Sequence, residues 1–295
     1  MVQTASALRV RWRGVFVFLL LAFGLAWIPF LALHSNTNPT VQTLILLLQF
    51  VPAIAAALVR GPLLREGFAD SGLRLQLTRR QSRSTYGYAL LLLPLLLVGA
   101  ILLGLALRLA TWAPQSSQTN GVLPLGFGGL PLPSSVLGIV VLVAVLSIPG
   151  ALITFGEEFG WRGYLLPRLM PLGQNWAILL SGLIWAAWHL PLNLLYGVNG
   201  GLQGFPFWLV WTIGLGAVLG WLRLRSQSVW PAAIMHAQVD ALPRLEGVLL
   251  APTASDPVFV ILQLGVIALG LVLALRGSLT HWWLQQDAPA GVKPA

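Results

Sequence analysis

The sequence predicts an all-α fold: a polytopic transmembrane helical bundle of about eight spans. Of its 295 residues, 57% are hydrophobic and only 8% are charged, and the mean hydropathy is +0.82. A soluble domain carries about 25% charged residues. A chain so poor in charge would aggregate in water, so lipid is the solvent that fits it. We therefore expect a multi-pass protein of the cell membrane, with membrane lipid as its immediate partner.

Eight apolar runs are long enough to cross a bilayer, which takes about 20 residues. Each should be helical, because lipid offers no partner for an unpaired backbone group. The runs are Gly14–Leu33, Val41–Val59, Tyr86–Leu107, Ser135–Leu169, Trp176–Leu195, Pro206–Leu222, Trp230–Leu250 and Val258–Leu275. The fourth run is too long for one straight crossing, and we expect Pro149 and Gly150 to kink it. Residues 1–295 are expected to form one membrane-embedded domain, with a disordered tail at 286–295.

The positions of the basic residues predict how the chain is oriented across the membrane. Of the 17 Lys and Arg residues, all but Arg108 and Arg244 fall on one side of the predicted spans. Positive charge favours the cytoplasmic side, so both the N- and C-termini are predicted to be cytoplasmic. The charges cluster between apolar runs and not along one polar face, so nucleic acid is not an expected partner. The sequence has no cysteine, which excludes a cysteine nucleophile and thiolate metal sites.

Ionisable side chains inside the predicted spans are the candidates for chemistry. Such residues cost on the order of 3 kcal/mol each in a bilayer and persist where they are paired, hydrated or catalytic. The acids and histidines that fall within spans are Glu157, Glu158, His189, His236, Asp240 and Glu246. They concentrate in a motif-bearing core at about residues 148–245.

Two of these residues are predicted to meet across a helical hairpin. Glu157 lies about as many residues before the turn at 171–173 as His189 lies after it. On antiparallel helices of equal rise, the two side chains reach a similar depth. A carboxylate facing an imidazole suits general-base activation of a water molecule.

Two further pairs have the i, i+4 spacing of one helix face. Glu158 and Arg162 have the favourable order for an ion pair, while Glu157 points about 100° away from Glu158. His236 and Asp240 also share a face and could bind a metal, support an oxyanion or simply hold helices together. Each pair alone fits a structural role; their combination favours an active site.

At these residues the sequence resembles the CPBP (Abi) family, which includes CAAX prenyl proteases and lysostaphin-resistance-type proteins. The motifs are Glu157-Glu158-Phe-Gly-Trp-Arg162, Trp185-Ala-Ala-Trp-His189 and His236-Ala-Gln-Val-Asp240. They occur in the family's order, between about Thr154 and Asp240. The resemblance implies an intramembrane endopeptidase.

The resemblance also implies roles for the residues. Glu157 would activate water with the assistance of His189, and Glu158 with Arg162 would be the supporting ion pair. His236 and Asp240 would support the oxyanion of the scissile carbonyl. In the family's older interpretation, Glu157, His189 and His236 bind a divalent metal such as zinc. Both versions stay open at the level of sequence.

Two positions depart from the family pattern. Trp185 stands where phenylalanine is commoner, which changes the bulk of the pocket. Asp240 stands where the prenyl proteases have asparagine, and an ionised aspartate cannot donate to an oxyanion. It would have to be protonated, bind a metal or orient His236.

We therefore predict an endopeptidase that hydrolyses a peptide bond of a membrane-associated protein or peptide, whether prenylated or not. The first alternative is a non-catalytic membrane scaffold or immunity-type protein that keeps the fold without turnover. The second is a small-solute transporter, which would also use intramembrane acids but usually shows internal repeats. We find no internal repeat in the sequence.

Overall fold

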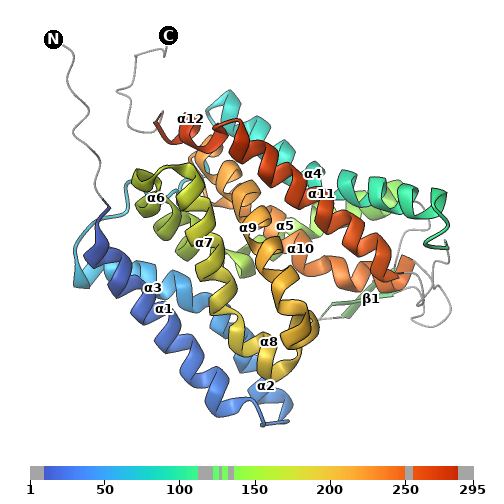
Figure 1. Ribbon diagram of the computed structural model, residues 1–295, viewed down its shortest axis with the longest axis horizontal. Helices are drawn as coiled ribbons and strands as arrows, with labels where there is room; N and C mark the ends of the chain where they lie inside the picture. The colour runs from blue at the N-terminus through green and yellow to red at the C-terminus, as the bar shows by residue number, and fades with distance from the viewer. Residues whose placement is uncertain (1–9, 112–121, 126–127, 132–135, 250–254, 285–295) are drawn as a thin grey trace.

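The computed structural model describes residues 10–111, 122–125, 128–131, 136–249 and 255–284, where the chain forms a bundle of helices (Figure 1). The predicted all-α class is confirmed. The predicted tail at 286–295 lies outside the described residues. The helices are α1 (Trp12–Leu33), α2 (Pro39–Leu46), α3 (Val51–Leu58), α4 (Arg80–Ala106), α5 (Val136–Gly160), α6 (Leu166–Leu169), α7 (Gln174–Trp188), α8 (Leu190–Tyr196), α9 (Gly201–Ser226), α10 (Trp230–Leu249), α11 (Ser255–Leu275) and α12 (Ser278–Leu284).

Shorter elements join these helices. The 3-10 turns are η1 (Leu47–Phe50), η4 (Met170–Leu172) and η5 (Val198–Gly200), and the π-helical turns are η2 (Val59–Leu63) and η3 (Trp161–Leu165). Two short strands, β1 (Val122–Leu125) and β2 (Gly128–Pro131), pair as an antiparallel hairpin between α4 and α5.

Seven helical stretches within the described residues are long and apolar enough to span a membrane. They are Trp12–Leu33, Leu44–Leu63, Arg80–Ala106, Val140–Leu172, Gln174–Tyr196, Gly201–Ser226 and Pro257–Leu275. Each corresponds to one of the eight predicted runs. The remaining run forms α10, whose His236, Gln238 and Asp240 make it more polar than the others. Helix α10 packs against α5, α4 and α9. Its polar side chains can therefore face protein groups, and the helix does not need to be apolar on every side.

Helix α1 shows how the bundle meets lipid. Phe18, Ala22 and Ala26 follow one another at i, i+4 spacing and are fully buried, whereas Leu20 and Ile28 are about 70% exposed. A helix that is apolar on its buried and its exposed side is suited to a lipid environment. The indole N–H of Trp188 donates to the carbonyl of Ala22 at 3.0 Å, which ties α1 to the end of α7.

The kink expected at Pro149 stays a prediction, because α5 is helical on both sides of that residue. Helix α5 continues through Pro149, and the regular α-helix is replaced by the π-helical turn η3 immediately after Gly160. Gly156 and Gly160 face η1 and α3 so closely that a Cβ on either would overlap their backbone. This small-xxx-small pair lets α5 approach the second span and so fixes the helix that carries Glu157 and Glu158.

The segments predicted to share one side of the membrane do meet at one end of the bundle. Arg168 donates to Asp70 at 2.7 Å, and Gln174 Oε1 accepts from the backbone N–H of Leu279 at 3.1 Å. Figure 1 shows α6, the start of α7 and α12 together at that end. The alternation of the spans therefore agrees with the topology inferred from charge, while the cytoplasmic placement of this end stays a prediction.

Candidate active site

Glu157 and Glu158 lie on the last turn of α5, directly before η3. Their exposed fractions are 7% and 0%. Successive helical residues point about 100° apart, so the two carboxylates have different neighbours. The neighbours of each carboxylate indicate which of the two supports the site and which is suited to accept a proton.

Glu158 is the carboxylate that pairs with Arg162, as the i, i+4 spacing predicts. Arg162 Nη1 lies 2.7 Å from Glu158 Oε1, and both side chains are buried. The same oxygen lies 2.8 Å from His236 Nδ1. Glu158 thus joins η3 to α10, which fits a supporting role.

His189 lies where α7 gives way to α8. It ends α7 and precedes α8, whose second residue is Pro191. Proline lacks the N–H that would continue the hydrogen-bond ladder of α7, so the helix is interrupted there. His189 Nδ1 lies 2.9 Å from the carbonyl oxygen of Trp185, which leaves Nε2 as the nitrogen directed at Glu157.

Glu157 and His189 come together as the hairpin geometry predicts. The distance from Glu157 Oε2 to His189 Nε2 is 3.9 Å. Glu157 makes no ion pair with Lys or Arg within the described part of the chain, in contrast to Glu158. The arrangement leaves Glu157 as the carboxylate better suited to accept a proton.

Helix α10 contributes the third motif. His236 is buried, whereas the side chain of Asp240 is about half exposed, and their Nε2 and Oδ1 atoms are 3.7 Å apart. The two ring nitrogens of His236 therefore face two different carboxylates, those of Glu158 and Asp240. This contact holds the ring in a fixed orientation beside the Glu157–His189 pair.

Trp185 does more than fill space in the site, because it contacts residues of all three motifs. Its indole N–H donates to Glu157 Oε2 at 2.7 Å, and the guanidinium carbon of Arg162 lies 4.1 Å from its ring centroid. Its ring also packs edge-on against His236, with centroids 5.4 Å apart. A phenylalanine would keep the stacking and lose the hydrogen bond. The sign of this role in the sequence is the tryptophan in the second motif, at a position where phenylalanine is commoner.

Aromatic rings also enclose His189. The centroid of Trp188 lies 4.9 Å from that of His189, and the centroid of Trp208, from α9, lies 5.3 Å away. Trp208 belongs to no motif, and only the structure brings it to the site. These rings limit the positions that His189 can adopt and lower the local polarity.

The fit of a divalent metal can be judged from the donor set. Among the residues that the structure describes, no three His, Asp or Glu side chains are grouped as metal ligands. Glu157 Oε2 already accepts from Trp185, and Nδ1 of His236 lies 2.8 Å from Glu158 Oε1. The three residues named for a metal are not arranged as its ligands here, and we derive no step through a metal.

A comparison with protein families gave a match. A model of the family described as "Type II CAAX prenyl endopeptidase Rce1-like" matches residues 132–242. The matched segment contains all three motifs and ends just after Asp240. No curated protein matched the chain.

Proposed function

We propose that the chain, whose residues 132–242 match the model of the Rce1-like type II CAAX prenyl endopeptidase family, is an intramembrane endopeptidase in which Glu157 and His189 activate the attacking water. The observation that carries this proposal is the 3.9 Å approach of Glu157 Oε2 to His189 Nε2 inside a bundle of apolar helices. Their positions match the glutamate and histidine of the family motifs.

In the proposed reaction, Glu157 takes a proton from water. The resulting hydroxide attacks the carbonyl carbon of the scissile peptide bond, and the C–N bond then breaks. The proton held by Glu157 passes to the departing amine, which restores the carboxylate. His189 shares the hydrogen bonding of the water and of Glu157. The Trp185 N–H keeps Glu157 Oε2 in position throughout.

We assign the Nε2–H of His236 to the oxyanion that forms on the scissile carbonyl, because Nε2 lies 3.7 Å from Asp240 Oδ1, which is longer than a hydrogen bond. A fixed donor aimed at developing charge is worth more in a site of low polarity than in water. Asp240 would orient His236, since an ionised carboxylate cannot donate a hydrogen bond. This assignment accommodates aspartate where the prenyl proteases have asparagine.

Glu158 and Arg162 would hold the site together. Their pair is buried, and removal of one partner from a buried ion pair leaves a charge without compensation. Glu158 also orients His236 through its Nδ1. The pair therefore links the base on α5 to the oxyanion residue on α10.

Two observations support a substrate class: the site lies among apolar helices, and the matching family is described as a CAAX prenyl endopeptidase. Membrane-associated proteins can bring a peptide bond to residues within the bilayer, and the family is described as acting on CAAX prenyl substrates. We propose a prenylated C-terminal segment as the substrate, and the cell membrane as the location.

The test uses the purified full-length protein in liposomes with two peptides that share one CAAX sequence. One peptide carries a farnesyl group on its cysteine, and the other carries none. Mass spectrometry should show release of the C-terminal tripeptide from the farnesylated peptide at a higher rate. Equal cleavage of both would contradict the prenyl requirement, and cleavage of neither would contradict the proposed substrate class. Parallel reactions with a chelator measure metal dependence.

A further inference from the structure

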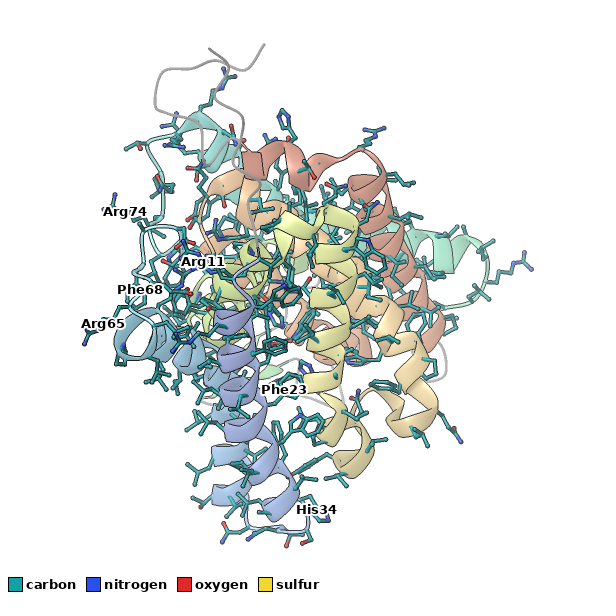
Figure 2. The ribbon with its side chains drawn as sticks, turned by 60° about the vertical axis from the view of Figure 1, so that its left-hand side comes forward. Arg11, Phe23, His34, Arg65, Phe68 and Arg74 are labelled. Atoms are coloured by element: carbon teal, nitrogen blue, oxygen red, sulfur yellow. The ribbon has the colours of Figure 1, made fainter. Side chains whose placement is uncertain are left out.

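The loop between η2 and α4, residues 64–79, forms a basic surface at the end of the bundle where α6 and α12 lie. We call it the basic loop. Figure 2 shows Arg65, Phe68 and Arg74 of this loop on the same side as Arg11, far from His34. The exposed arginines of the loop and of the start of α4 are Arg65, Arg74, Arg79, Arg80 and Arg83. They give this end of the molecule a concentrated positive charge.

The acidic residues of the loop do not offset that charge at the surface. Asp70 lies 2.6 Å from Arg60 and 2.7 Å from Arg168, and Glu66 lies 2.7 Å from the second guanidinium nitrogen of Arg168. Arg60 is buried and Arg168 nearly so. Both carboxylates are thus occupied by arginines of the bundle, and the arginines at the surface of the loop stay in excess.

Apolar side chains are interleaved with these arginines. Phe68, Leu73, Leu75 and Leu77 are 40 to 50% exposed. Exposed leucine and phenylalanine in such number are unfavourable in water. At the edge of a bilayer they can enter the acyl region while neighbouring guanidinium groups remain among the headgroups. The combination favours a lipid surface over an acidic protein as the partner.

The surface is held in place by contacts to the helices of the candidate site. The backbone N–H of Val229 donates to the carbonyl of Gly72 at 2.9 Å, and Trp230 Nε1 donates to that of Leu73 at 2.9 Å. Gly72 has a φ of +77°, and a Cβ there would lie 2.5 Å from Arg223 Nε. Only glycine fits this approach. The backbone of the loop is therefore held in a defined place against these helices.

We propose that the basic loop binds the headgroups of anionic phospholipids. Their phosphate groups would pair with Arg65 and Arg74, and their acyl chains would take up the neighbouring leucines. This site is separate from the proposed peptidase chemistry, and none of its exposed arginines belongs to the candidate active site.

Native mass spectrometry of the full-length protein tests the proposal without any cleavage assay. The protein in detergent is offered equimolar phosphatidylglycerol and phosphatidylcholine with the same acyl chains. The wild type should retain phosphatidylglycerol preferentially. The double variant R65Q/R74Q should reduce that preference by about 30-fold, the change expected when two basic side chains are removed from an anionic surface.

Two controls make the outcome decisive. R65K/R74K keeps the charges and should keep the preference, which also guards against loss through misfolding. Arg108→Gln removes an exposed arginine at the opposite end of α4 and should change nothing. Equal retention of both lipids by the wild type, or the same loss in Arg108→Gln as in R65Q/R74Q, would overturn the proposal. Binding of a hexaglutamate peptide that needs Arg65 and Arg74, without lipid preference, would instead assign the surface to an acidic protein segment.

Discussion

The indole N–H of Trp185 donates to Glu157 Oε2 at 2.7 Å, and the ring of the same tryptophan lies under the guanidinium group of Arg162. One side chain thus contacts the proposed base and the supporting ion pair. A hydrogen bond to a buried carboxylate restricts its rotation and stabilises its charge. Trp185 is therefore a positioning residue for Glu157.

Trp185→Phe should keep the fold and lower the cleavage rate. The ring that stacks on Arg162 is retained, while Glu157 loses a hydrogen bond of the kind that contributes about 1.5–3 kcal/mol. The expected loss in kcat/KM is roughly 10-fold to 100-fold. Trp176→Phe, on the exposed face of the same helix, is the matched control. Equal activity of the wild type and Trp185→Phe would show that the hydrogen bond has no part in catalysis.

Arg162→Ala should destabilise the protein strongly. It leaves Glu158 buried beside His236 without its cation, and removal of one partner of a buried pair costs about 3–5 kcal/mol. Thermal unfolding in detergent should show a clearly lower Tm. Arg276→Ala removes an exposed arginine and serves as the control. An unchanged Tm for Arg162→Ala would remove the stabilising role of the pair.

Asp240→Asn should keep most of the activity. The amide oxygen can still face the His236 ring as the carboxylate does, and the amide group adds a donor for an oxyanion. Asp240→Ala should be much less active because it offers neither. Cleavage rates of both variants on one substrate make the comparison. If the asparagine variant were as inactive as the alanine variant, the negative charge itself would be required, as for a metal ligand.

Asp70 makes the stability of the basic loop depend on pH. Partial burial raises its pKa, but hydrogen bonds and charge attraction from Arg60 and Arg168 outweigh this and lower the pKa from 3.8 to about 2. A carboxyl group whose pKa is lower in the folded state than in the unfolded state stabilises the fold at pH values above its unfolded-state pKa. This stabilisation is lost as the pH falls through the folded-state pKa. The Tm of the wild type should therefore exceed that of Asp70→Asn at neutral pH, and the difference should shrink between about pH 4 and pH 2. A difference that persists at pH 2 would contradict this assignment.

The spans and the meeting of Glu157 with His189 could be predicted from the sequence because both depend on counting along helices. Length and hydropathy identify a span, and a short turn brings residues equally distant from it to the same depth. The Glu158–Arg162 pair followed from i, i+4 spacing in the same way. α10 was also predicted as a helix, although its polar residues set it apart from the apolar spans.

Other features depend on contacts between segments that are remote in sequence. Asp70 meets Arg168 across 98 residues, and no local pattern indicates that approach. The π-helical turn that follows Gly160 adjoins the close packing of Gly156 and Gly160 on the second span, a contact that no local pattern indicates. The hydrogen bond from Trp185 depends on the side-chain rotamer, which spacing does not specify.

The Glu157→Gln variant tests the central claim most directly. A glutamine can still accept the hydrogen bond from Trp185, so the variant should fold with a Tm close to that of the wild type. It cannot take a proton from water, and loss of a general base costs about 10²–10⁴ in rate. The measurement is cleavage of the farnesylated CAAX peptide by wild type and variant in liposomes. Cleavage by the wild type that is lost in the folded variant is the expected result, and cleavage by Glu157→Gln at the wild-type rate would contradict Glu157 as the base.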